Sequence, residues 1–183
     1  MRLSLIFFFF SISLVAQTDN NALRLIQLST TVNASVEEVY KAWTTTEGIR
    51  TFFAPGGKID LKIGGAYEIY FAPDAEPGQK GADSMFILSY EPDKMLTFTW
   101  TATPYQPSIR GQLLYVQLMF YPAEGNKTLV HFVSGGFGQG EKWTEVYNYF
   151  QKAWGGWVLP ALKYRFAVGP VDWQNPPDVS EYK

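Results

Sequence analysis

The period of the hydrophobic residues changes near Glu141, and this change constrains the fold more than any other feature of the sequence. Before it, short runs of alternating apolar and polar residues are separated by turns rich in glycine and proline, which is typical of antiparallel strands. After it, the apolar residues recur at helical spacing. A sheet with one apolar face needs a cover, and the C-terminal helix is the only long amphipathic element available.

Seven strands are expected, one before and six after a pair of short helices. The alternation is clearest where Leu96, Phe98 and Trp100 fall on one face of a single run. Gly64 and Gly65 stand where a two-residue hairpin turn would join two of the runs. The expected strands are residues 22–34, 58–63, 66–71, 82–90, 95–100, 113–121 and 128–137.

The two short helices have recognisable starting signals. Ser35 and Glu38 form the S-x-x-E pattern of a capping box at the start of the first helix. Thr46 is a candidate cap for the second helix, which Pro55 and the two glycines after it bring to an end.

The C-terminal helix has a broad, mostly aromatic face but contains residues that helices usually avoid. Pro160 has no N–H to donate to the carbonyl of Gly156, so the helix must bend or loosen at this point. Gly155 and Gly156 lower the resistance to such a bend. The apolar face comprises Trp143, Val146, Tyr147, Phe150, Trp154, Trp157, Val158 and Ala161.

Together these elements predict an α+β fold in which a curved antiparallel sheet of about seven strands wraps around the C-terminal helix. Where sheet and helix diverge, we expect a cavity lined by aromatic side chains, as ligand pockets commonly are. The alternative is that these side chains only fill the core, since aromatic residues at helical spacing are more often core than site. The candidate lining residues are Phe53, Tyr67, Ile69, Phe98, Trp100, Trp143, Tyr147, Phe150 and Trp154.

Four segments resemble the SRPBCC (START / Bet v 1-like) superfamily: "TTVNASVEEVYKAWTTTEGIRTFFAP", "GGAYEIYF", "YEPDKMLTFTW" and "YFQKAWGGWVLPALKYRFAVGPVDW". Within it, they are most similar to the group named after the C-terminal domain of the activator of heat-shock-protein-90 ATPase. The resemblance runs from about Leu23 to Trp173 and implies a helix-grip fold without a common catalytic set. It also implies members that bind lipids, hormones or polyketides, some that cyclise them, and others that are partners of a chaperone. In the stretch "SGGF", Ser134 occupies the position of a histidine found in many relatives, so no role of that histidine is transferred.

The N-terminus has the pattern of a secretory signal. Arg2 precedes the apolar run Leu3–Val15, and Ala16 offers a small residue for cleavage. A membrane anchor is the alternative, but the run is shorter than the roughly 20 residues that span a bilayer. The expected organisation is a signal peptide (1–16), a flexible lead-in (17–22), a START-like helix-grip domain (23–169) and a Pro-rich C-terminal tail (170–183).

Composition limits the partners that the chain can have. The formal net charge is −2 and the basic residues are scattered, which excludes the basic stripe that nucleic-acid binding requires. We expect an exported protein, periplasmic or extracellular, without a membrane contact after signal cleavage. The absence of cysteine rules out disulfides and a thiol nucleophile. Nothing in the sequence specifies an oligomeric state.

The sequence contains no recognisable catalytic set, metal site or cofactor motif. His131, the single histidine, alternates with apolar neighbours and is predicted to point outward. The acidic residues of the loop around Asp74, Glu76 and Asp83 lack the spacing of a calcium loop and indicate a solvated loop. Glu68 and Arg110 could each place a charge at the pocket, but an exposed position is expected for Glu68, because burying an unpaired charge is costly.

Three functional hypotheses remain. The first is an exported, non-catalytic binding protein that holds a small hydrophobic molecule between sheet and helix. The second is a cyclase or hydratase on the same fold, which requires a buried carboxylate with a raised pKa next to a tyrosine. The third is a protein-interaction module of the chaperone-activator kind, which requires a large exposed apolar patch outside the pocket.

Overall fold

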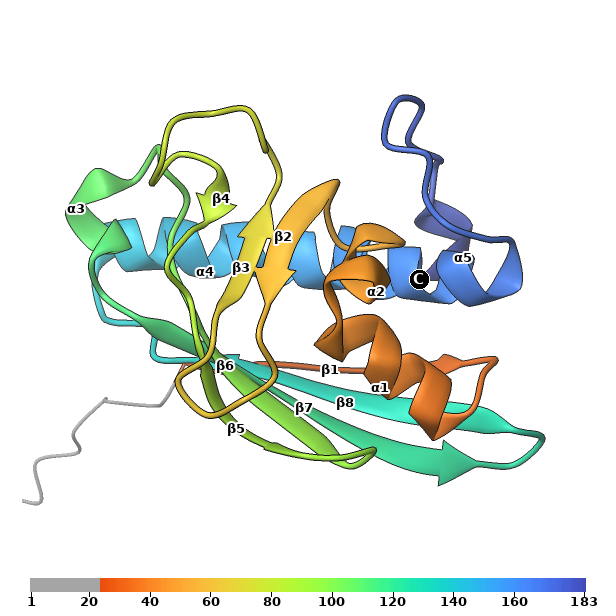
Figure 1. The fold of residues 1–183 in the computed structure, drawn as a ribbon. Coiled ribbons are helices and arrows are strands. Elements are labelled where there is room, and N and C mark those ends of the chain that lie inside the picture. Colours follow the sequence, from red (N-terminus) through yellow and green to blue (C-terminus); the bar gives the residue numbers. More distant parts are fainter. Residues whose placement is uncertain (1–23) are drawn as a thin grey trace, which may run out of the picture.

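The computed structural model describes residues 24–183, which form two antiparallel sheets arranged around a long C-terminal helical segment (Figure 1). The predicted signal peptide, the whole lead-in and the first residue of the predicted domain, Leu23, lie outside the described residues. The α+β class and the curved antiparallel sheet with its long C-terminal helix agree with the prediction.

The larger sheet has five strands in the order β1-β8-β7-β6-β5. Every neighbouring pair is antiparallel, and β7 and β8 form a long hairpin through the short turn after Ala123. The alternation in β6 is confirmed, since Leu96, Phe98 and Trp100 are all buried. The strands are β1 (Ile26–Val32), β5 (Ile87–Glu91), β6 (Met95–Trp100), β7 (Leu114–Ala123) and β8 (Lys127–Gly135).

The smaller sheet has three strands, β2 (Gly56–Ile59), β3 (Tyr67–Tyr70) and β4 (Gly81–Ala82). The predicted two-residue hairpin at Gly64-Gly65 is wrong, because Ile59 pairs with Tyr67 and residues 60–66 form a longer connection. That connection is bonded to β5 instead. Gly64 donates its N–H to the Ile87 carbonyl at 2.8 Å, and Ile87 donates to Gly65 at 2.9 Å. The run predicted at 82–90 also divides, so β4 and β5 belong to different sheets and the described residues contain eight strands.

The short helices are α1 (Val36–Thr44) and α2 (Thr46–Arg50). The capping box of Ser35 and Glu38 is confirmed. The cap of α2 is Thr45 rather than Thr46, and its hydroxyl accepts the Gly48 N–H at 2.9 Å. The Thr46 hydroxyl instead accepts the Ile59 N–H at 3.0 Å, which fixes α2 to the end of β2.

The C-terminal segment consists of α4 (Glu141–Ala153), a π-helical turn η1 (Trp154–Val158) and α5 (Leu159–Ala167). In η1 the Leu159 N–H donates to the Trp154 carbonyl, one residue further back than in an α-helix. The predicted loosening next to Pro160 is therefore confirmed. Within the described residues, no helix combines the length and the apolar character that crossing a bilayer requires.

The helical segment crosses the concave face of the five-stranded sheet, and the smaller sheet stands on its other side (Figure 1). Trp154 is the central contact, with only 1% of its surface exposed. Its ring centroid lies 4.8 Å from Phe132 of β8 and 5.0 Å from Trp100 of β6. Burial of a large aromatic side chain contributes on the order of 2–3 kcal/mol relative to exposure, so this contact anchors the helix firmly.

The C-terminal residues return to α2. The Val171 N–H donates to the Thr51 carbonyl at 2.8 Å, and the Trp173 indole donates to the Arg50 carbonyl at 2.6 Å. Val179 is buried just before the short 3₁₀ helix η2 (Ser180–Tyr182). The tail thereby covers the far side of the helical segment.

Tyr67 links the smaller sheet to α1 in the core. Its hydroxyl donates to the Trp43 carbonyl at 3.0 Å, and its ring stacks on Phe98 with 3.9 Å between centroids. Tyr67 is completely buried, and burial raises the pKa of its hydroxyl well above the ordinary value. The folded state therefore keeps this hydroxyl protonated at a pH where the unfolded chain ionises it.

We expect Tyr67→Phe to lower the free energy of unfolding by about 1 kcal/mol at pH 7, because a buried hydrogen bond is lost. Above about pH 10, where an unfolded tyrosine ionises, the wild type should lose stability faster than this variant by up to about 1.4 kcal/mol per pH unit. Urea unfolding from pH 7 to 11 measures both effects. Tyr121→Phe, at an exposed tyrosine, should follow the wild type, and equal slopes for all three proteins would contradict the assignment.

Candidate functional site

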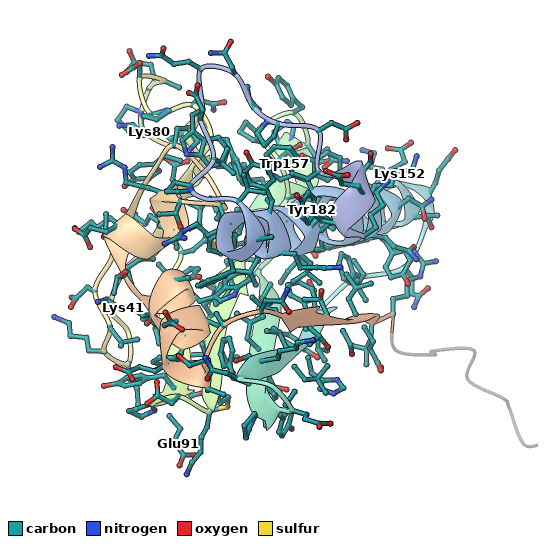
Figure 2. All side chains as sticks on the ribbon, turned by 90° about the vertical axis from the view of Figure 1, so that its right-hand side faces the viewer. Lys41, Lys80, Glu91, Lys152, Trp157 and Tyr182 are labelled. Carbon is teal, nitrogen blue, oxygen red and sulfur yellow. The ribbon has the colours of Figure 1, made fainter. Side chains whose placement is uncertain are left out.

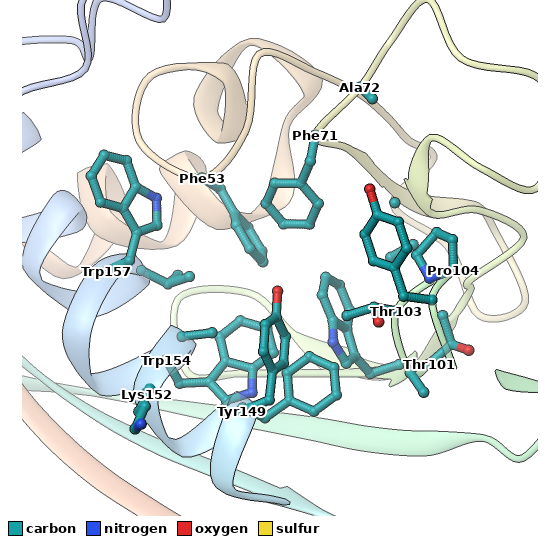
Figure 3. A pocket seen from close by; sticks show the side chains of 18 of the residues that line it. Phe53, Phe71, Ala72, Thr101, Thr103, Pro104, Tyr149, Lys152, Trp154 and Trp157 are labelled. Atoms are coloured by element: carbon teal, nitrogen blue, oxygen red, sulfur yellow. The ribbon is translucent and has the colours of Figure 1, made fainter. Parts of the chain in front are cut away.

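A pocket of about 670 Å³ lies along one side of the helical segment (Figure 3). One wall is formed by α4 and η1, and the opposite wall by Phe53 and the residues at the open end of the smaller sheet. The chain between β6 and the short helix α3 (Pro107–Arg110) closes the third side. The pocket therefore lies between the helix and the smaller sheet, and no residue of β1, β7 or β8 contributes to its lining.

The inner end of the pocket is a cluster of stacked aromatic rings. Phe53 lies 5.7 Å from Trp100 and 5.7 Å from Trp154 between ring centroids, and all three are buried. The outer end is aromatic but exposed, since 48% of Phe71 and 50% of Tyr149 are accessible. Figure 3 shows Phe53 and Phe71 facing Tyr149 and Trp154 across the space. The site is thus an apolar cleft with a solid floor and an open mouth.

The structure places four of the nine predicted lining residues in this pocket, namely Phe53, Trp100, Phe150 and Trp154. The other five are part of the surrounding core. Tyr67 and Ile69 of β3 and Phe98 of β6 are fully buried, and Tyr67 stacks on Phe98 between the two sheets. Trp143 and Tyr147 lie a few turns earlier on α4, where each packs edge-on against Phe137.

Sequence reasoning missed the parts of the lining that come from loops. Residues 79–82 and 101–105 line the pocket, and they carry no hydrophobic period that would mark them. Trp157 is different, because it belongs to the apolar face recognised in the sequence. Its place in the lining depends on the π-helical turn, which changes the direction of the side chains after Trp154.

The charged residues of the lining are Lys80 and Lys152. No aspartate, glutamate or histidine occurs among the lining residues of the described chain. The remaining polar groups are uncharged and come from Gln79, Thr101, Thr103 and the tyrosine hydroxyls. The pocket is therefore apolar in its depth, with positive charge as the only formal charge on its walls.

Arg110 connects the two loops that border the pocket. Its guanidinium donates to the carbonyls of Ala102 at 2.6 Å, Gly81 at 2.7 Å and Gly78 at 2.9 Å. Asp83 lies 3.3 Å from the same guanidinium, and its carboxylate accepts the N–H groups of Gly78 and Gly81. The expectation of a solvated loop is thus wrong for Asp83, which is tied to Arg110 as a structural pair.

Glu68 is a bound carboxylate rather than an exposed one. One oxygen accepts the Tyr70 hydroxyl at 2.6 Å, and the other accepts the Ser84 N–H at 2.8 Å. Partial burial, together with this hydrogen bond to Glu68, raises the pKa of Tyr70 to about 12. The exposed position expected for Glu68 is wrong because these two donors compensate its half-buried charge. Neither residue lines the pocket.

His131 points outward as predicted. It is exposed on β8, where its ring lies 3.0 Å from the Ser29 hydroxyl and packs edge-on against Tyr121. The described residues contain no group of three histidine, aspartate or glutamate side chains placed to hold a metal ion. His131 therefore lies outside the pocket lining.

Comparison with known families finds one match. The family described as "Activator of Hsp90 ATPase homolog 1-like protein" matches residues 33–164, well over half of the chain. Among curated proteins, no sequence matches significantly.

Solved structures share the fold at low sequence identity. The Aha1 dimer from Colwellia psychrerythraea is 18% identical with a TM-score of 0.60, over 79% of this chain and 97% of that one. CalU16 from Micromonospora echinospora is 23% identical with a TM-score of 0.58, over 80% and 78% of the two chains. An HSP90 activator from Plasmodium falciparum is 15% identical with a TM-score of 0.58, over 80% and 97%. At these identities, the comparisons establish the architecture alone.

The contacts of Arg110 predict a local effect of removing its donors. We expect Arg110→Met to lower the opening free energy of the loop around Gly78 and Gly81 by about 2 kcal/mol, since hydrogen bonds from a charged group are lost while the aliphatic stem remains. Amide hydrogen exchange should become roughly 30-fold faster in peptides covering residues 72–83. Arg50→Met, at an exposed arginine, is the control. Unchanged exchange in the loop would show that Arg110 does not hold it.

Proposed function

Because the chain belongs to the family of Activator of Hsp90 ATPase homolog 1-like proteins, we propose that it acts through the pocket that its fold leaves beside the C-terminal helix. In this proposal the protein is an exported, non-catalytic binding protein, and its ligand is a small hydrophobic molecule. The proposal rests on the geometry of the pocket rather than on the names of the similar structures.

The observation that carries the proposal is an open apolar cavity whose inner end is lined by buried aromatic side chains. Its volume of about 670 Å³ lies in the range of roughly 300–1,000 Å³ that small-molecule sites occupy. The inner walls are the buried rings of Phe53, Trp100 and Trp154, which offer flat apolar surface to a guest. Burying that surface under a ligand is favourable at about 25 cal/mol per Å².

The polar residues support binding without catalysis. The cyclase or hydratase hypothesis requires a buried carboxylate with a raised pKa next to a tyrosine. The nearest match to that requirement in the described residues is the pair of Glu68 and Tyr70, and both lie outside the lining. Since the pKa of Tyr70 is raised to about 12, its hydroxyl stays protonated at neutral pH and is a poor general base there.

Export is the second component of the proposal and rests on the N-terminal sequence. Arg2 followed by the apolar run Leu3–Val15 has the charge and the length of a secretory signal. A binding protein outside the cytoplasm would meet hydrophobic molecules as they leave or approach the cell. Immunodetection of the full chain in periplasmic and culture fractions of an expressing cell tests this component separately.

Filling the pocket should abolish binding without unfolding the protein. Gly156 lies in the lining, and a Cβ built there meets no heavy atom within 4 Å. We therefore expect Gly156→Phe to place its ring in the cavity and to weaken binding of the neutral fluorescent probe N-phenyl-1-naphthylamine by at least about tenfold. Fluorescence titration measures the affinity, and a thermal melt checks the fold.

The matched control for this variant is Gln151→Phe, which adds the same side chain at an exposed position of α4 outside the lining. Ala153→Phe, one turn earlier on the lined wall, provides a second blocked pocket. Binding by wild type and control but not by the two blocked variants supports the proposal. Failure of the wild type to bind the probe, or equal affinity in all four proteins, would overturn it.

A further inference from the structure

We propose that the ligand of this pocket is an amphipathic anion, with an apolar body in the aromatic cleft and a carboxylate or similar acidic head at its mouth. This inference rests on the proposed function and names the chemical class of its ligand. It comes from the charges of the lining.

The lining carries positive charge, whereas the whole protein has a negative net charge. The whole chain has 17 acidic and 15 basic residues, so a random set of wall residues would carry no positive excess. The lining nevertheless includes Lys80 and Lys152 and no carboxylate. Neither lysine forms an ion pair with any residue that the structure describes. Two ammonium groups therefore remain available to a negatively charged guest.

The two lysines stand on different walls. Lys80 belongs to the loop between β3 and β4, and Lys152 belongs to α4. Figure 2 shows them on opposite sides of Trp157. The Lys80 ammonium lies 5.2 Å from the centre of the Tyr70 ring, a cation–π distance, although Tyr70 itself is outside the lining. The pocket thus has one cationic lining residue on each of two walls.

The carboxylates of Glu68 and Asp83 are already engaged by other donors. Glu68 accepts from Tyr70 and from the backbone at Ser84. Asp83 accepts from the backbone of its own loop and from Arg110. Because these oxygens have partners, they compete weakly with a ligand for the lysine.

Three probes with one chain length and different heads test the inference. Decanoate, decan-1-ol and decylamine compete with N-phenyl-1-naphthylamine for the full-length protein at pH 7.5, below their aggregation limits. We expect decanoate to displace the probe at roughly tenfold lower concentration than decan-1-ol, and decylamine to be the weakest competitor. Charge interactions are long-ranged in about 20 mM sodium chloride and screened in about 500 mM. Raising the salt between these values should therefore weaken the binding of decanoate and of neither other competitor.

Lysine variants locate the effect. Lys80→Gln and Lys152→Gln together should weaken decanoate by roughly tenfold and leave decan-1-ol unchanged, because each exposed charge pair contributes only a modest amount. Lys41→Gln is the control, since Lys41 is exposed on α1 and lies away from both lysines in Figure 2. Thermal melts confirm that all variants fold.

The outcomes separate this inference from the proposed function. The inference of an anionic ligand is supported if the wild type prefers decanoate and the double variant loses this preference. Equal displacement by decanoate and decan-1-ol would overturn the inference of an anionic ligand, while the proposed binding function would stand. A preference for decanoate that survives in the double variant would have the same consequence. If the neutral probe itself does not bind, the proposed function fails and this inference fails with it.

Discussion

The packing of one indole ring, that of Trp154, holds together the parts on which the rest of the structure depends. Trp154 contacts Phe132 of the large sheet, Trp100 at the end of β6 and Phe53 after α2. Two of these partners come from different strands of the five-stranded sheet, and the third comes from the segment after α2. The ring fills space toward the large sheet, and the pocket lies on the side of the smaller sheet.

The π-helical turn begins at this same residue and gives the two glycines separate environments. A Cβ at Gly155 would meet Leu28 of β1 at 3.6 Å, whereas a Cβ at Gly156 would meet open space in the pocket. A Cβ at position 155 would thus make an ordinary van der Waals contact with the sheet, whereas the absence of a side chain at Gly156 keeps the cavity unobstructed. Pro160 keeps the turn in place, since it cannot donate to the carbonyl that an α-helix would use.

Hydrophobic periodicity predicted the layers of the fold, and local contacts decided the remainder. The strand pattern and the aromatic helix face could be predicted from the sequence because each repeats over several residues, as in Leu96, Phe98 and Trp100. The position of the β2–β3 connection could not be predicted from the sequence, because it depends on a backbone hydrogen bond between Gly64 and Ile87, which are distant in sequence. For the same reason the sequence indicated Phe53, Trp100, Phe150 and Trp154 for the pocket, but not the loop residues around Lys80 and Thr103, whose position depends on Arg110.

The Arg110 contacts have a consequence for how a guest would leave. Because one guanidinium bonds both to residues 78–83 and to Ala102, the two borders of the mouth cannot swing apart independently. Opening is then a single cooperative event that ruptures several bonds from a charged donor at once. Under the proposed function, residence time and equilibrium affinity would therefore depend on different residues: the aromatic floor would set the affinity, and Arg110, which does not line the pocket, would set the residence time.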